Sequence, residues 1–210
     1  MHLLQKELKG IYLFLKRNKN EVVVISFATL FLTLDKYNPI WNEWFSSLIY
    51  YAVLPIIVIV VLLRRNPLDF GFRFGNPRIW GIYVAATCLV AVPILYIASL
   101  SPSFQSYYKI EQFNLINYFI EECAILFALE FLFRGFLIFG LKDKLKEGSI
   151  LIQMIPFVLV HFGKPELETV STILTGIYFG FIAYRGNSYW PAFIIHMFIN
   201  VFFIASVNLL

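Results

Sequence analysis

The sequence predicts an all-α fold, a polytopic bundle of about seven transmembrane helices that forms one domain over residues 1–210. Its 210 residues are 60% hydrophobic and only 14% charged, whereas soluble domains are about half apolar and about a quarter charged. Apolar runs near the length that crosses a bilayer recur along the chain, and Lys and Arg gather in alternate segments between them. This composition excludes an ordinary soluble enzyme, a disordered chain and a nucleic-acid-binding domain.

The first predicted element is an amphipathic segment, residues 1–21, that lies at the cytoplasmic membrane surface. Lys and Arg are interleaved there with Leu and Ile, which is typical of interfacial helices. Residues 64–78 contain two Pro and two Gly and are expected to form a loop. The seven spans are predicted at residues of about 22–34, 45–63, 79–100, 115–141, 150–162, 170–184 and 190–209.

The distribution of Lys and Arg predicts the orientation of these spans. Thirteen of the 17 basic residues lie before the first span or after the second, fourth and sixth, and three lie in the alternate loops. By the positive-inside rule the N-terminus is cytoplasmic and the C-terminus is outside. Together with the short loops, this leads us to expect an integral protein of a prokaryotic plasma membrane.

Charged and polar residues lie inside the later spans, where an ionised side chain costs at least about 2.5 kcal/mol. Glu130 and Arg134 are four residues apart and share one helix face; alone, they could be no more than a buried ion pair. His161 ends an apolar run, and His196 and Asn200 are again four apart. Because these groups come from three different spans, they predict a pocket inside the bundle.

The chemistry that this set suits is the activation of water. A carboxylate such as Glu130 can accept a proton from water, a histidine can hold that water, and a second histidine with an amide can stabilise an oxyanion. Alternatively, Glu130, His161 and His196 could supply three ligands to a divalent metal such as zinc. The chain lacks the HExxH pattern of zinc proteases, so the sequence requires no cofactor and leaves the metal open.

Other features have mainly structural interpretations. Glu121 and Glu122 are expected at the outer interface, or else at an acidic mouth of the pocket. Gly176 and Gly180 form a Gly-x-x-x-Gly pattern that favours close packing of two helices. The cysteines fall in apolar runs and indicate no disulfide framework.

Three motifs occur in order along the last four spans: Glu130-Phe-Leu-Phe-Arg134-Gly135, Phe157-Val-Leu-Val-His161 and His196-Met-Phe-Ile-Asn200. They resemble the motifs of the CPBP intramembrane proteases, a family that includes type II CAAX prenyl endopeptidases and the bacteriocin-processing and self-immunity (Abi) proteins. The segments Tyr184-Arg-Gly-Asn-Ser-Tyr-Trp-Pro191 and Asp69-Phe-Gly-Phe-Arg-Phe-Gly75 are also similar to family sequences. The resemblance implies a catalytic core over residues 114–208 that hydrolyses peptide bonds of a peptide or membrane-protein substrate in the bilayer.

The resemblance also implies roles for individual residues. Glu130 is the expected general base, His161 its water-holding partner, and Arg134 the group that orients Glu130. His196 and Asn200 are expected to position the water or to stabilise the oxyanion.

One position departs from the family pattern. The first motif usually opens with two glutamates, and Leu129 stands where the first is expected. Either Glu130 takes the role of the base, or Glu122 reaches the cavity, or the chain is a non-catalytic binding or immunity protein. A proton-coupled transporter is a further alternative, because intramembrane Glu, His and Arg also mark proton relays; the absence of an inverted repeat argues against it.

Overall fold

The computed structural model describes residues 2–209, and that part of the chain contains helices and no strand. The α-helices are α1 (His2–Arg17), α2 (Lys19–Tyr37), α3 (Glu43–Leu48), α4 (Leu54–Val58), α5 (Pro77–Ser99), α6 (Pro102–Tyr108), α7 (Leu115–Glu130), α8 (Ile138–Leu145), α9 (Gly148–Leu159), α10 (Glu166–Gly186) and α11 (Trp190–Leu209). Short π-helical stretches, η1 (Ile49–Val53), η2 (Ile59–Leu63) and η4 (Phe131–Leu137), join some of them, and η3 (Pro67–Asp69) is a 3₁₀ turn. The all-α prediction is therefore confirmed.

Within residues 2–209, five helices are long and apolar enough to cross a membrane: Glu43–Leu63, Pro77–Ser99, Leu115–Leu145, Glu166–Gly186 and Trp190–Leu209. They lie at five of the seven predicted positions. The other two predicted spans correspond to α2 and α9. Only 13 residues separate Glu21 from Asp35 in α2, or about 20 Å of helix, and α9 has 12 residues, or about 18 Å. Both are shorter than a hydrocarbon core of about 30 Å, so the count of seven remains a prediction.

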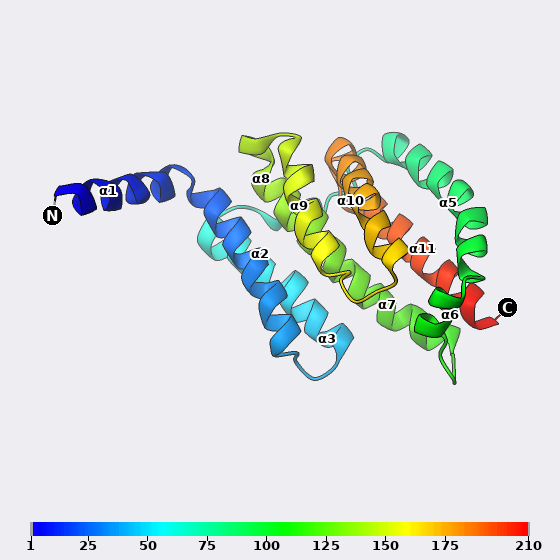
Figure 1. Cartoon of the computed structure of the whole chain (residues 1–210). Helices are drawn as coiled ribbons and strands as arrows, with labels where there is room; N and C mark the ends of the chain where they lie inside the picture. Colours follow the sequence, from blue (N-terminus) through cyan, green and yellow to red (C-terminus); the bar gives the residue numbers. More distant parts are fainter. Residues whose placement is uncertain (1, 210) are drawn as a thin grey trace.

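The five long helices, together with α2 and the shorter α9, run in alternate directions along the chain, which brings the basic connecting segments to one end of the bundle (Figure 1). At this end Arg65 Nη1 lies 3.0 Å from Asp143 Oδ2, and Lys142 Nζ donates to Asn187 Oδ1 at 3.0 Å. Residues 18–21, 64–78, 142–147 and 185–190 form what we call the basic end. The arrangement agrees with the predicted alternation of charge, and the cytoplasmic location of the basic end remains a prediction.

The helix formed by α7, η4 and α8 is the centre of the fold. All seven residues of η4 are buried, and its phenylalanines Phe131, Phe133 and Phe136 have no exposed surface. A π-helical turn widens the helix locally and often occurs at functional sites. This stretch begins directly after Glu130 and contains Arg134, so the least exposed part of the bundle carries the first motif.

Small residues let α9 and α10 approach closely, as the Gly-x-x-x-Gly pattern predicts. Gln153 Nε2 of α9 donates to the carbonyl of Gly176 at 2.7 Å, and a Cβ added to Gly180 would lie 2.7 Å from the same Nε2. Distances below 3.0 Å are not tolerated without movement. Close packing here fixes the end of α9, where the chain turns toward His161.

Candidate functional site

Glu130, Arg134 and His196 form a hydrogen-bonded chain inside the bundle. Glu130 Oε1 accepts from Arg134 Nη1 at 3.1 Å and lies 2.7 Å from His196 Nδ1. Glu130 and Arg134 are completely buried, whereas the His196 side chain is 13% exposed. The carboxylate therefore joins a buried cation on its own helix to an imidazole on α11.

Aromatic faces surround the Arg134 guanidinium. Its Cζ lies 3.9 Å from the ring centroid of Phe157, 5.4 Å from that of Phe179 and 5.7 Å from that of Phe133. A cation over a ring face is attracted by the ring quadrupole, most strongly where water is excluded. These rings and the Glu130 carboxylate together compensate a charge that would otherwise be costly to bury.

The two imidazoles present a free ring nitrogen each. His161 Nδ1 lies 2.7 Å from the carbonyl oxygen of Phe157, which can only accept, so Nδ1 carries the proton and Nε2 is the free acceptor. His196 Nδ1 faces Glu130 Oε1, which also accepts from Arg134, so Nδ1 donates to the carboxylate and Nε2 is again free. The ring of Phe157 packs against both histidines: its centroid lies 4.7 Å from that of His161 and 6.1 Å from that of His196.

A cavity of about 300 Å³ connects His161, His196 and Asn200. The structure thus brings together three of the five predicted site residues around one space. Glu130 and Arg134 do not line this cavity, because Glu130 lies behind His196. A carboxylate in that position can orient an imidazole but has no direct access to the cavity.

A family model described as Type II CAAX prenyl endopeptidase Rce1-like matches residues 112–202. We call residues 112–202, the part that matches this model, the Rce1-like core. The match confirms the family resemblance over α7 to α11, and the five predicted site residues all lie in this core. At the family level it indicates an integral membrane protein with CAAX-protease-like endopeptidase activity and a peptide substrate. No curated protein and no solved structure matches the chain.

The segment before the Rce1-like core reaches back to it at the basic end. The Tyr189 backbone N–H donates to the carbonyl of Gly71 at 3.1 Å, and Trp190 Nε1 donates to that of Phe72 at 2.8 Å. Residues 69–75 and 184–191, which both resemble family sequences, therefore lie against each other. This contact fixes the start of α11, the helix that carries His196 and Asn200.

Tyr118 is a residue of the site that sequence reasoning missed. Its hydroxyl donates to Oδ1 of Asn200. Because the amide oxygen is occupied in this way, the NH₂ group of Asn200 is the part that remains for a ligand. No spacing rule relates Tyr118 to Asn200, since the pair forms across two helices.

Tyr108, Lys164 and Glu168 also line the cavity and form a polar cluster that the sequence did not indicate. Glu168 accepts from the Tyr108 hydroxyl at 2.6 Å and lies 3.0 Å from Lys164 Nζ. Burial raises the pKa of the Tyr108 phenol above its ordinary value, and the hydrogen bond to Glu168 raises it further, so Tyr108 stays a neutral donor. The four-residue spacing of Lys164 and Glu168 was the only available signal.

The remaining carboxylates considered from the sequence do not enter the cavity. Leu129 is partly buried against the main hydrophobic core. Glu121 is exposed and Glu122 is half-buried, and neither lines the space between the histidines. Glu122 is, however, a neighbour of the Tyr118 hydroxyl that binds Asn200, so it lies beside the site without lining the cavity.

The three-ligand zinc alternative does not fit the residues. Among residues 2–209, no group of three or more His, Cys, Asp and Glu side chains is arranged to hold a metal ion. Glu130 does not line the cavity that His161 and His196 share, so the three side chains do not converge on one ligand position.

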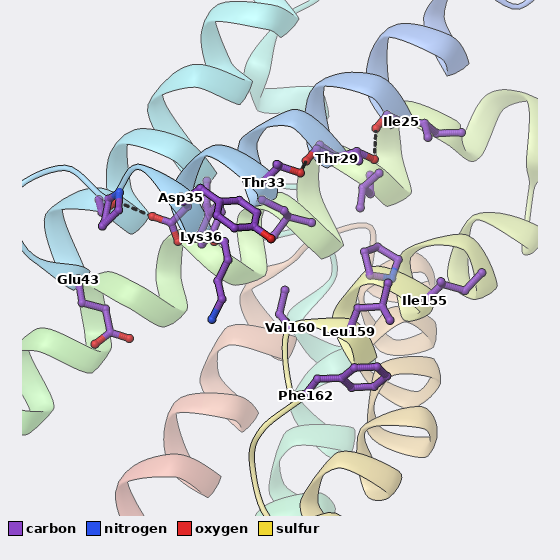
Figure 2. A pocket seen from close by; sticks show the side chains of 18 of the residues that line it. Ile25, Thr29, Thr33, Asp35, Lys36, Glu43, Ile155, Leu159, Val160 and Phe162 are labelled. Carbon is purple, nitrogen blue, oxygen red and sulfur yellow. Dashed lines mark hydrogen bonds between the residues drawn. The ribbon is translucent and has the colours of Figure 1, made fainter.

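A larger groove of about 1010 Å³ lies between α2, α3 and α9 (Figure 2). Apolar side chains such as Ile25, Ile155 and Leu159 line much of it. Its Asp35 carboxylate is already bonded, to Ser46 Oγ and, at 2.5 Å, to Tyr51 Oη. The groove contains no histidine, so the smaller cavity is the better candidate for chemistry.

Proposed function

We propose that the protein is an intramembrane endopeptidase in which the pair Glu130–His196 activates water. The 2.7 Å contact between Glu130 Oε1 and His196 Nδ1, with the carboxylate buried and the imidazole lining the cavity, carries this proposal. A carboxylate that accepts from one imidazole nitrogen fixes the tautomer and makes the other nitrogen more basic. The sequence predicted Glu130 as the base itself; its position behind His196 favours a base role for His196.

The proposed reaction begins with water held between the free Nε2 atoms of His161 and His196. His196 takes a proton from this water as its oxygen attacks the peptide carbonyl, and Glu130 stabilises the imidazolium that forms. The Asn200 NH₂ group donates to the oxyanion. His196 then returns the proton to the leaving amine as the C–N bond breaks, which completes hydrolysis.

Arg134 serves the reaction indirectly. Its guanidinium donates to Glu130 Oε1 at 3.1 Å and so holds the carboxylate where it can accept from His196. This proposal needs no glutamate at position 129.

The test is cleavage by the purified protein in lipid nanodiscs. A peptide panel would contain prenylated C-terminal peptides, their unprenylated counterparts and transmembrane segments, with products read by mass spectrometry. We expect wild type to cut at least one class, and His161→Ala and His196→Ala to lose at least 100-fold in rate while unfolding at wild-type temperature. Cleavage by both variants at the wild-type rate would overturn the proposal.

A non-catalytic binding or immunity protein is the second candidate, and Leu129 is the observation that favours it. It predicts that panel peptides bind without being cut, and that His161→Ala changes affinity alone. The same panel, read by binding as well as by mass spectrometry, separates the two.

A further inference from the structure

Helix α1 projects away from the rest of the molecule (Figure 1). Its eight large apolar side chains, those of Leu3, Leu4, Leu8, Ile11, Tyr12, Leu13, Phe14 and Leu15, are 44–74% exposed. An isolated 16-residue helix gains little stability from its own hydrogen bonds in water. Its exposed apolar side chains therefore need to be covered by a partner or a surface outside this chain.

The two faces of α1 differ in character. At 3.6 residues per turn, Leu4, Leu8, Ile11 and Leu15 fall on one stripe. Lys6, Lys9, Lys16 and Arg17 fall on the opposite face. With Lys19 and the single acidic residue Glu7, residues 3–19 carry a net charge of +4, which is complementary to an anionic surface.

The base of α1 is fixed to the basic end of the bundle. Lys144 Nζ, at the end of α8, contacts Asn18 Oδ1 and lies 4.0 Å from Glu21 Oε2. The helix leaves the bundle sideways from this point (Figure 1), so it runs beside the surface where the other basic segments emerge. An apolar stripe, a basic face and a position at the end of the spans are the features of a helix that lies in the membrane interface.

We propose that α1 binds the surface of an anionic bilayer. The stripe Leu4, Leu8, Ile11 and Leu15 inserts among the acyl chains, and the lysines contact lipid phosphates. A protein partner would need a matching acidic groove, whereas an anionic leaflet supplies both the negative charge and the apolar phase beside the basic end. This surface is independent of the proposed proteolysis.

The experiment uses the full chain with Cys88 and Cys123 replaced by serine, in nanodiscs of pure phosphatidylcholine or with 30% phosphatidylglycerol. A polarity-sensitive fluorophore is attached at Leu8→Cys on the apolar stripe or at Leu13→Cys on the basic face, two positions that are 57% and 52% exposed. We expect blue-shifted emission and quenching by spin-labelled lipid at position 8 alone, and more of both in the anionic discs. Equal signals at the two positions in both discs would overturn the proposal.

Charge is tested separately with Lys6→Gln/Lys9→Gln/Lys16→Gln. Because the screening length falls from about 10 Å at 0.1 M salt to about 3 Å at 1 M, insertion of wild type should decrease as salt rises, and the variant should insert equally in both lipids. Insertion of wild type that is indifferent to salt and lipid charge would contradict anionic recognition. Thermal unfolding of each variant verifies that the bundle is intact.

Discussion

At the scale of single residues, the hydrogen-bond acceptors in the site determine how its side chains are oriented. Glu130 Oε1 receives both Arg134 and His196, and a carbonyl receives His161. These contacts leave Nε2 of both histidines for a ligand. The catalytic proposal follows from this order of donors and acceptors.

Tyr118 tests whether the orientation of Asn200 matters. Tyr118→Phe removes the hydroxyl that occupies Asn200 Oδ1, so the amide is free to turn. We expect kcat to fall by about 10-fold to 100-fold, the usual effect of losing a supporting hydrogen bond, with KM unchanged. Steady-state kinetics measure the split; a rise in KM at constant kcat would assign Tyr118 to substrate binding.

Arg134 tests the compensation of buried charge. Arg134→Leu leaves the buried Glu130 without its cation, which should lower the free energy of unfolding by about 3–5 kcal/mol. Glu130→Leu/Arg134→Leu removes both charges and should recover most of that loss without recovering cleavage. Unfolding in detergent measures both variants. Equal destabilisation of the two would show that packing of the guanidinium, and not charge, is what Arg134 supplies.

At the scale of helices, the sequence predicted pairs within a helix better than contacts between helices. The four-residue spacing predicted that Glu130 and Arg134 share a face, and they are hydrogen-bonded in the structure. All five site residues were predicted to share one pocket, and His161, His196 and Asn200 line the cavity. Spacing defines a face but not the neighbour of that face. The position of Glu130 behind His196, and the contact from Tyr118, depend on how α7 and α11 pack and could not be predicted.

Glycine at the contact of α9 and α10 gives a test at this scale. A Cβ at Gly180 would meet Gln153 Nε2 at 2.7 Å and Ile150 Cγ2 at 2.9 Å, whereas a Cβ at Gly81 of α5 meets nothing within 4 Å. We expect Gly180→Ala to cost about 1–3 kcal/mol through overpacking and Gly81→Ala to be neutral or slightly stabilising. Thermal unfolding compares them, and equal effects would contradict close packing at Gly180.

At the scale of the whole molecule, composition and charge predicted the class of protein and the two ends of the bundle. The predicted count of seven spans is not confirmed, because Glu21 and Asp35 limit the apolar stretch of α2 to 13 residues and α9 has 12 residues. Both stretches are shorter than an unperturbed hydrocarbon core. Both helices line the larger groove, so the two shortest apolar stretches lie on the same side of the bundle.

The orientation is tested by labelling cells that express single-cysteine variants in a background of Cys88→Ser/Cys123→Ser. Glu147→Cys lies in the exposed connection at the basic end, and Glu166→Cys lies at the exposed start of α10 at the other. With the basic end in the cytoplasm, an impermeant maleimide should label position 166 in intact cells, and position 147 only after lysis. The reverse pattern would invert the predicted topology.

The central claim is that Glu130 acts through His196, and a double-mutant cycle of cleavage rates tests it most directly. The rates of Glu130→Gln, His196→Asn and the double variant are compared with wild type on the best peptide of the panel, under single-turnover conditions. Residues that act as one unit give non-additive losses. We expect the double variant to be no slower than His196→Asn alone, whereas losses that multiply would show that Glu130 acts on water independently and would contradict the account.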